Sequence, residues 1–437
     1  MKFTSTGSAA VSASDLSEAI IKGIAPDGGL YVPTQLPALT VSDFDGLESL
    51  PGIAERLLAP FVAGSALEPE LAAICREALN FPAPLVALDR APGPASVLEL
   101  FHGPTCAFKD FGARFLAASL ERVTPRSRRG SAQRLTILVA TSGDTGGAVA
   151  AAFYKRPWVE IALLYPKGRV SDRQAQQLAC WGDNVRTFAV SGSFDDCHRV
   201  VNEAFRDPEL ARSHALSSAN SINLGRLLPQ MSYYAAAALQ IWRREGRKPG
   251  FIIPAGNLGN AVAGIWAREI GLPIGDIVLA TNENRTIADY MDGGSWRPRP
   301  GVPTLASAMD VGNPSNVHRL RWLYEDDDRV RERVSAYSVT DQEIRAAIAG
   351  DAASLGYAWC PHGATAAHVY RMLARRRAHQ HWILVATAHP AKFNDIVEPL
   401  LGRPVAVPPA LERLLNLPRQ EQEIPPALES LRARLLS

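Results

Sequence analysis

Short apolar runs alternate with longer segments of helical pattern through the middle of the chain. A continuous apolar run of about four to eight residues is typical of a strand that is buried on both faces. Such runs predict strands over residues 135–140, 159–164, 185–190, 251–253, 276–280 and 382–386. Helical patterns follow over 148–154, 172–180, 195–205, 219–240 and 258–269. Strands that alternate with helices predict an α/β protein whose parallel sheets are covered by helices.

The two ends of the chain show a different pattern. The first 93 residues contain dense turn signals, two helical stretches at about 51–59 and 68–79, and then a series of prolines. The last residues are polar, with helical spacing that prolines interrupt. We therefore predict an N-terminal domain over 1–93, a large α/β domain over 94–132 and 235–410, a smaller α/β domain over 133–234, and a helical tail over 411–437.

Composition restricts the class of protein. The chain has 437 residues, of which 47% are hydrophobic, and this length suggests two or three cores. A formal net charge of +2 gives no strong field for nucleic acid, and no apolar run is long enough to predict a membrane span. Five cysteines without CxxC spacing argue against disulfides and against a metal site. We expect a cytoplasmic protein, monomeric or homodimeric, that binds neither nucleic acid nor membrane.

Glycine-rich turns follow two of the expected strands, at the edge of the sheet where α/β proteins bind ligands. The segment Gly256-Asn257-Leu258-Gly259-Asn260 opens a helix, whose free N–H groups and dipole favour a phosphate. The segment 141–147 offers hydroxyls and backbone N–H groups to a carboxylate or phosphate, and it lacks the P-loop pattern. A tight turn or a capped helix start explains either segment about equally well.

Three further segments contain side chains suited to chemistry. Lys109 lies between two phenylalanines, where an apolar setting would lower its pKa and expose a neutral amine. Thr387 follows the last expected strand and could present its hydroxyl to a ring nitrogen. Asn223 and Arg226 are spaced to share a helical face and suit a phosphate. A surface lysine, an ordinary strand threonine and a surface pair remain open as alternatives.

Taken together and in this order, the segments resemble threonine synthases of bacteria and yeast. The resemblance rests on blocks along almost the whole chain: Gly28-Gly29-Leu30, HGPTCAFKDFG (102–112), ATSGDTGGAVA (140–150), NSINLGRLLPQ (220–230), AGNLGN (255–260), AMDVGNPSN (308–316) and ATAHPAKF (386–393). That family is similar in fold to the β subunit of tryptophan synthase. The resemblance therefore implies the type II pyridoxal-phosphate fold, with two parallel-sheet α/β domains, a small N-terminal domain and pyridoxal 5'-phosphate as cofactor.

The resemblance also implies roles for individual residues. Lys109 would hold the cofactor covalently and then act as a base, Thr387 would bind the pyridine nitrogen, and Asp144 would lie beside the 3-hydroxyl. The cofactor phosphate would be held by Gly256, Asn257, Leu258, Gly259 and Asn260. Binding of a phosphorylated amino acid would fall to Thr105, Ser142, Thr145, Asn223, Arg226 and Lys167. The expected reaction is loss of phosphate from O-phospho-L-homoserine with addition of water to give L-threonine.

Several positions depart from the pattern expected of the family. They are Asp172-Arg173-Gln174-Ala175-Gln176, Arg285, Cys360 and Leu258. Charge near a pocket decides which anion fits, so a second hypothesis keeps the fold and cofactor but changes the substrate. That enzyme would be a lyase or synthase acting on another phosphorylated, phosphonate or γ-substituted amino acid. A third hypothesis is a non-catalytic homologue that serves as a binding module.

Overall fold

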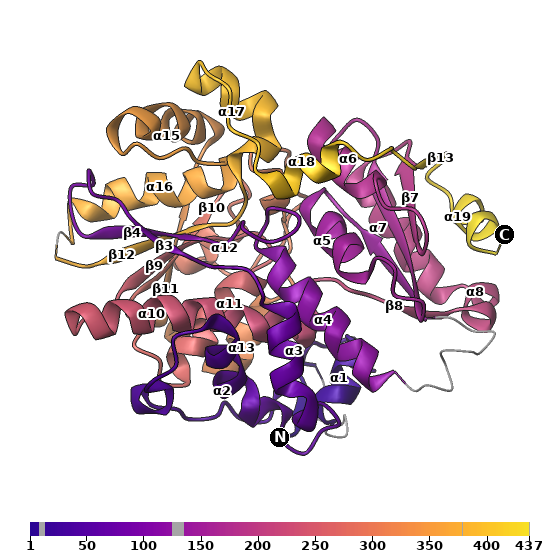
Figure 1. Ribbon diagram of the computed structural model, residues 1–437, viewed down its shortest axis with the longest axis horizontal. Helices are drawn as coiled ribbons and strands as arrows, with labels where there is room; N and C mark the ends of the chain where they lie inside the picture. The colour runs from indigo at the N-terminus through magenta and orange to yellow at the C-terminus, as the bar shows by residue number, and fades with distance from the viewer. Residues whose placement is uncertain (8–13, 125–134, 378, 437) are drawn as a thin grey trace.

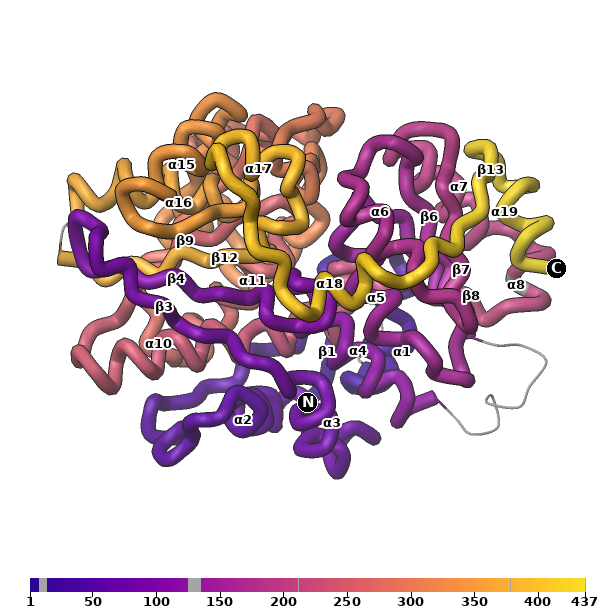
Figure 2. The backbone as a smooth tube through the Cα atoms, turned by 45° about the horizontal axis from the view of Figure 1, so that its top comes forward, coloured from indigo at the N-terminus to yellow at the C-terminus, as the bar shows by residue number. Residues whose placement is uncertain are grey.

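Two larger β-sheets lie side by side in Figures 1 and 2, and an N-terminal unit, mostly helical with the two-stranded sheet β1–β2, packs below them in the view of Figure 1. The computed structural model describes residues 1–7, 14–124, 135–377 and 379–436. Within these ranges, no helix combines the length and apolar character that crossing a membrane requires. The two sheets with their N-terminal unit confirm the predicted α/β fold class. The domain limits stay predictions, and the limit between 132 and 133 lies outside the described residues.

The larger sheet joins strands that are far apart in the sequence. Its order is β11-β10-β9-β12-β4-β3, and all neighbours are parallel except the edge pair β3–β4. The strands are β3 (Leu85–Ala87), β4 (Ala95–Glu99), β9 (Gly250–Pro254), β10 (Ile277–Thr281), β11 (Val334–Ser338) and β12 (Trp382–Ala386). Helices α10 (Met231–Glu245) and α11 (Gly259–Glu269) lie on one side, and α15 (Asp341–Ser354) and α16 (Pro361–Ala374) lie on the other (Figure 1). Because helices cover both faces of the sheet, every residue of β9, β10 and β12 is buried. This burial explains why these strands appear in the sequence as apolar runs.

The smaller sheet is parallel throughout, in the order β13-β7-β6-β5-β8. Its strands are β5 (Leu135–Ala140), β6 (Val159–Pro166), β7 (Val185–Val190), β8 (Ala215–Ser217) and β13 (Gln422–Ile424). Its helices are α5 (Asp144–Phe153), α6 (Asp172–Ala179), α7 (Phe194–Arg206), α8 (Pro208–Ser213) and α19 (Leu428–Leu435). The predicted helical tail is therefore wrong at 422–424, where the chain adds an edge strand beside β7. That strand is short and polar, so its sequence alone does not predict it, and it forms by pairing with β7.

The N-terminal unit packs against α4 (Lys109–Val123) and α10. It contains β1 (Phe3–Ser5), α1 (Leu16–Lys22), β2 (Tyr31–Pro33), α2 (Leu50–Val62) and α3 (Leu71–Ala78). Helix α2 shows why the sequence predicted it: Ser49 caps its first turn, and its apolar residues recur at helical spacing and are buried. The two helical stretches predicted near the start of the chain are α2 and α3.

The remaining helices connect these layers. They are α9 (Leu224–Leu227), α12 (Thr286–Met291), α13 (Val317–Tyr324), α14 (Asp327–Arg333), α17 (Asn394–Leu401) and α18 (Pro409–Leu415). The helix predicted over 219–240 is divided into α9, the 3₁₀ turn η4 (Leu228–Gln230) and α10. Pro229 lies in this turn, and a proline interrupts a continuous helix because it lacks an N–H donor.

Candidate active site

A cavity of about 120 Å³ lies between the carboxyl ends of strands from both sheets. Loops after parallel strands meet at this edge, which is where such folds place ligands. The wall is formed by Phe108, Lys109, Asp144, Thr145, Ser221, Arg226, Gln230, Pro254, Ala255, Gly256, Asn257, Leu258, Gly259, Asn260, Ala261, Ala308, Met309, His362 and Thr387. The structure thus brings together every residue that the sequence predicted to hold the cofactor.

Lys109 is the first residue of α4, and the loop before it is paired with the segment that follows β12. Ala107 forms an isolated antiparallel bridge with Ala388, and the Phe108 N–H donates to the Thr387 carbonyl at 2.8 Å. This pairing sets Lys109 and Thr387 on one wall. Burial lowers the pKa of the Lys109 amine to about 8, although the charge of Asp144 opposes the shift.

A buried ion pair joins Asp144, which lines the cavity, to Lys392, which is outside the lining. Lys392 Nζ is 2.8 Å from Asp144 Oδ1 and also donates to the Thr105 carbonyl at 2.8 Å. Burial alone would raise the pKa of Asp144, but the charges of Lys392 and Lys109 prevail and hold it well below its usual range. Asp144 is therefore a fixed negative charge beside the amine of Lys109. Sequence reasoning missed Lys392, because only the fold brings this end of the ATAHPAKF block against α5.

The glycine-rich loop forms another part of the wall and ends at the start of α11. Leu258, the N-cap residue, has a left-handed φ of 63° and makes no side-chain cap, so the first N–H groups of the helix are free to bind an anion. A Cβ on Gly256 would lie 2.8 Å from Met309 Cα, so this close approach requires glycine. The side chain of Asn260 accepts from Tyr233 and Tyr234, while its Nδ2 has no partner among the described residues.

Two further polar groups face the cavity. Arg226 is buried, donates from Nη1 to the Ala219 carbonyl, and leaves its Nε without a partner in the described structure. His362 Nε2 accepts from the Ala308 N–H at 3.1 Å, which places the ring proton on Nδ1. Burial lowers the pKa of His362 to about 4, so the ring is neutral at pH 7. The sequence had marked the segment of His362 only as a departure at Cys360, and so missed it.

Four of the six predicted substrate residues do not line the cavity. Thr105 is fully buried and donates its N–H and hydroxyl to Asp110, which fixes the loop before Lys109. Asn223 caps α9 and donates to the Ile20 carbonyl, and Lys167 is exposed and pairs with Glu423. The remaining residue of the four, Ser142, lies in the loop before α5. Only Thr145 and Arg226 line the wall.

The chemistry of this cavity fits pyridoxal phosphate. The Lys109 amine suits an aldehyde, the start of α11 suits a phosphate dianion, and the Thr387 hydroxyl suits a ring nitrogen. The unpartnered buried atoms, Asn260 Nδ2 and Arg226 Nε, are donors that a bound anion would satisfy. Fold and cavity together define a pyridoxal-phosphate-dependent enzyme of fold type II.

Comparison with known families narrows this class. The family described as "Pyridoxal-phosphate dependent enzyme" matches residues 78–387. Two flanking families match as well: "Threonine synthase N terminus" over residues 2–79 and "Threonine synthase, C-terminal" over residues 363–434. The chain belongs to the threonine synthase family.

Individual relatives agree over nearly the full length. The threonine synthase of Haemophilus influenzae is 38% identical over 422 residues, which cover 96% of each chain. The crystal structure of pyridoxal-phosphate-bound threonine synthase from Brucella melitensis is 34% identical, with a TM-score of 0.89, and covers 100% of this chain and 98% of that one. The yeast threonine synthase structure is 28% identical, with a TM-score of 0.92 and coverage of 100% and 98%. These findings confirm the predicted family, fold and cofactor.

Proposed function

We propose that the chain converts O-phospho-L-homoserine and water into L-threonine and inorganic phosphate. One observation carries the proposal: Lys109, the start of α11 and Thr387 line one cavity together with a second cationic group, Arg226. A substrate that carries its own phosphate needs such a second group in addition to the site for the cofactor phosphate. The similarity to threonine synthases over nearly the whole chain supports this choice of substrate.

Residues from three separate segments would hold the aldehyde, the phosphate and the ring nitrogen of pyridoxal phosphate. Lys109 would bind the aldehyde carbon, Gly256 to Asn260 the phosphate, and Thr387 the pyridine nitrogen. When bound, the cofactor supplies a conjugated ring that stabilises negative charge on the substrate carbons next to the amino group. Asp144, held ionised by Lys392, would accept a hydrogen bond at the ring's edge.

The Lys109 amine is suited to move a proton at the substrate α-carbon. Because burial lowers its pKa to about 8, a substantial fraction of the free amine is neutral near pH 7 to 8. An ordinary lysine, with a pKa of about 10.4, would be almost wholly protonated there. Asp144 beside it stabilises the protonated form that results from the transfer.

Arg226 and Thr145 are the candidates for binding the substrate's own anionic groups. The unpartnered Nε of Arg226 can donate to the phosphate that leaves the γ-carbon. Thr145 lies in the first turn of α5, where backbone N–H groups and its hydroxyl suit a carboxylate.

A product assay tests the proposed reaction. Purified, cofactor-loaded protein is incubated with O-phospho-L-homoserine, and threonine and phosphate are measured over time. Equal molar amounts of both products at a catalytic rate are expected. Formation of 2-oxobutyrate alone, or no turnover of this substrate by loaded protein, would contradict the proposal and favour the alternative substrate class.

A lysine substitution tests the assignment of the amine. Lys109→Ala is expected to abolish turnover and borohydride-stable labelling by the cofactor, because no other lysine amine lines the cavity within the described residues. Lys248→Ala, which changes an exposed lysine, is the matched control and should retain both properties. Labelling that persists in Lys109→Ala would refute the assignment.

We also infer a cytoplasmic location and a monomeric or homodimeric state. All five cysteines are free and buried, and free thiols are typical of proteins in a reducing compartment. Fractionation of cells that produce the protein and sedimentation of the purified chain test these two inferences.

A further inference from the structure

Arg319, in α13, is a buried cation whose partners among the described residues are carbonyl and amide oxygens. Its side chain is fully buried, and no carboxylate contacts it in the described parts of the chain. Its guanidinium donates to the Tyr31 carbonyl from Nε and Nη2, at 3.1 and 3.0 Å, and to the Ile222 carbonyl at 2.6 Å. Burial lowers its pKa to about 9. A buried charge left without a counter-charge is costly, so its retention suggests an anion elsewhere.

Asn316 links this cation to the glycine-rich loop. Its Oδ1 accepts from Arg319 Nη1 at 2.6 Å, and this bond turns its Nδ2 toward the Asn257 carbonyl, to which it donates at 2.8 Å. The side chain of Asn257 is fixed at both ends as well. It accepts from the Ser315 N–H at 2.7 Å and donates to Ser221 Oγ at 2.8 Å. Residues from two separate segments, 315–316 and 221, therefore hold Asn257 by its carbonyl and its side chain.

The loop requires such support because its next residue is strained. Leu258 adopts a left-handed φ of 63°, which costs a residue with a Cβ on the order of 1 kcal/mol or more. The conformation aims the start of α11 into the cavity, and the helix makes no side-chain cap of its own. The Asn257 carbonyl, which Asn316 binds, belongs to the peptide immediately before this strained residue.

We propose that Arg319 is a positioning residue for the cofactor phosphate. Through Asn316 it fixes the Asn257–Leu258 peptide of the loop, and its uncompensated charge stabilises the phosphate dianion at the start of α11. The inference rests on the proposed function, in which pyridoxal phosphate binds in this cavity. It assigns a role in that binding to the AMDVGNPSN block and to the helix that follows it. It also explains why this arginine has carbonyl and amide partners in place of a carboxylate, which would neutralise the charge.

The test compares two cofactor forms that differ only in the phosphate. Full-length protein freed of cofactor is titrated with pyridoxal 5'-phosphate and with pyridoxal, and the dissociation constant of each is measured by absorbance. Arg319→Gln is expected to weaken pyridoxal phosphate binding about 10- to 100-fold, and pyridoxal binding less than about threefold. Equal weakening for both ligands, or for neither, would overturn the proposal.

Two companion variants separate charge from geometry. Arg319→Lys keeps the charge but loses the planar fork, so we expect an intermediate loss that remains specific to the phosphorylated form. Asn316→Ala removes the link to Asn257 and leaves Arg319 in place, and it should also weaken the phosphorylated form more than pyridoxal. This variant keeps the inference testable if Arg319→Gln does not fold. Equal losses of affinity for pyridoxal phosphate and for pyridoxal in Asn316→Ala would contradict the proposed role of the contact between Asn316 and Asn257.

Arg114 provides a matched control. Like Arg319, it donates to carbonyls of the N-terminal unit, those of Glu77 and Ala78, and to an asparagine side chain, Asn80. Among the described residues its hydrogen bonds reach neither Asn316 nor the glycine-rich loop, so Arg114→Gln should leave the ratio of the two dissociation constants unchanged. A wild-type protein that bound neither ligand would refute the proposed function itself, whereas binding with an unchanged ratio in Arg319→Gln would refute only this inference.

Discussion

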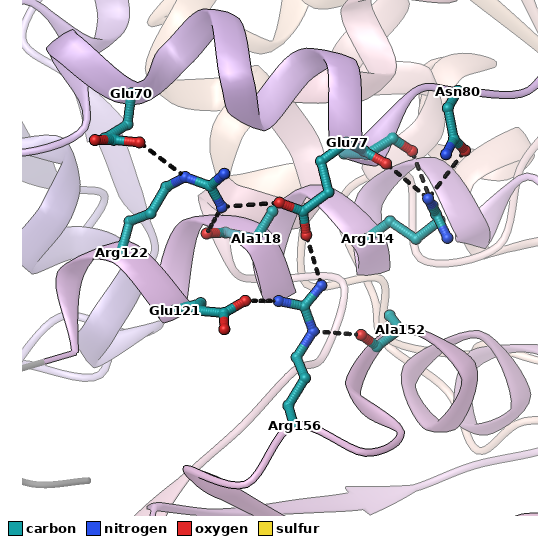
Figure 3. Close-up of polar contacts among 10 residues, drawn as sticks. Glu70, Glu77, Asn80, Arg114, Ala118, Glu121, Arg122, Ala152 and Arg156 are labelled. Atoms are coloured by element: carbon teal, nitrogen blue, oxygen red, sulfur yellow. Dashed lines mark hydrogen bonds and ion pairs between the residues drawn. The ribbon is translucent and has the colours of Figure 1, made fainter. Parts of the chain in front are cut away.

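This molecule contains a buried ion pair and a surface network of ion pairs, which are built from the same kinds of side chain but differ in their access to water. Lys392 and Asp144 form a pair at the cavity, which Asp144 lines, with side chains 1% and 4% exposed. Glu77, Arg122, Arg156 and Glu121 form a network where α3, α4 and the end of α5 meet, with side chains 19% to 37% exposed (Figure 3). The difference in water access decides what each contact does: the buried pair fixes a charge for chemistry, and the network joins helices at the surface.

The buried pair is strong only as a pair. Removing two charges from water is costly, and their mutual attraction offsets this cost when the geometry is good. Loss of one partner leaves the other buried without the counter-charge that it contacts directly. In the network, water solvates whichever charge remains, so loss of one member is tolerated.

The largest expected effect follows from Lys392→Met. Asp144 would keep its buried position without its cation, so we expect the free energy of unfolding to fall by about 3–5 kcal/mol, measured by urea denaturation. The pKa of Asp144 should also rise, because the charge that lowers it most is gone.

The double variant Lys392→Met, Asp144→Leu is the control for this prediction. It removes both charges, so most of the lost stability should return even though activity does not. A single variant as stable as the wild type would show that the pair is solvated and would remove the contrast with the surface network.

The contrast also marks the limit of what the sequence could predict. The loop 256–260 was visible as a local pattern, because a strand, a glycine-rich turn and a helix start follow one another there. The role expected of Lys109 came from the resemblance to threonine synthases, since its own segment left a surface lysine open. Lys392, His362 and Arg319 were not, since each acquires its role from contacts with residues distant in the sequence.

The fold shows the same division. The well-buried strands β9, β10 and β12 were visible as apolar runs, because helices cover both of their faces. Strand β13 was not visible, since its Gln-Glu-Ile sequence is mostly exposed and forms a strand only by pairing with β7. Lys167 was predicted at the substrate, yet it pairs with Glu423 of that same unexpected strand.

A smaller effect is expected from acid, through His362, which is buried and has no ion-pair partner in the part of the chain that the structure describes. The pKa of His362 is lowered by burial to about 4, from 6.5. In the unfolded chain His362 becomes protonated below about pH 6.5, whereas in the folded chain it stays neutral down to about pH 4. The free energy of unfolding therefore falls as the pH drops through this window. His362→Gln keeps an acceptor for the Ala308 N–H and should remove up to about 3 kcal/mol of this loss, measured by urea denaturation at several pH values.

His389 serves as an internal comparison for the acid prediction. Burial lowers its pKa to about 4 as well, and it lies outside the cavity wall. His389→Gln should reduce the acid loss over the same window but leave cofactor binding intact. An unchanged pH profile in His362→Gln would contradict the prediction.

The smallest effect is expected at the surface network, from Glu77→Gln. Glu77 bonds to Arg122 at 3.0 Å and to Arg156 at 2.7 Å, and Figure 3 shows it between the two. Its side chain is 37% exposed, so water can solvate both arginines after the change, and Glu121 and Glu70 remain as their partners. We expect a loss of at most about 1 kcal/mol in urea denaturation, smaller still in about 1 M salt, which screens exposed charges. Glu70→Gln, at a more exposed carboxylate that contacts Arg122 alone among the described residues, should cost less. A loss at Glu77 as large as that of Lys392→Met, and insensitive to salt, would mean that the network is functionally buried and that exposure does not separate the two regions.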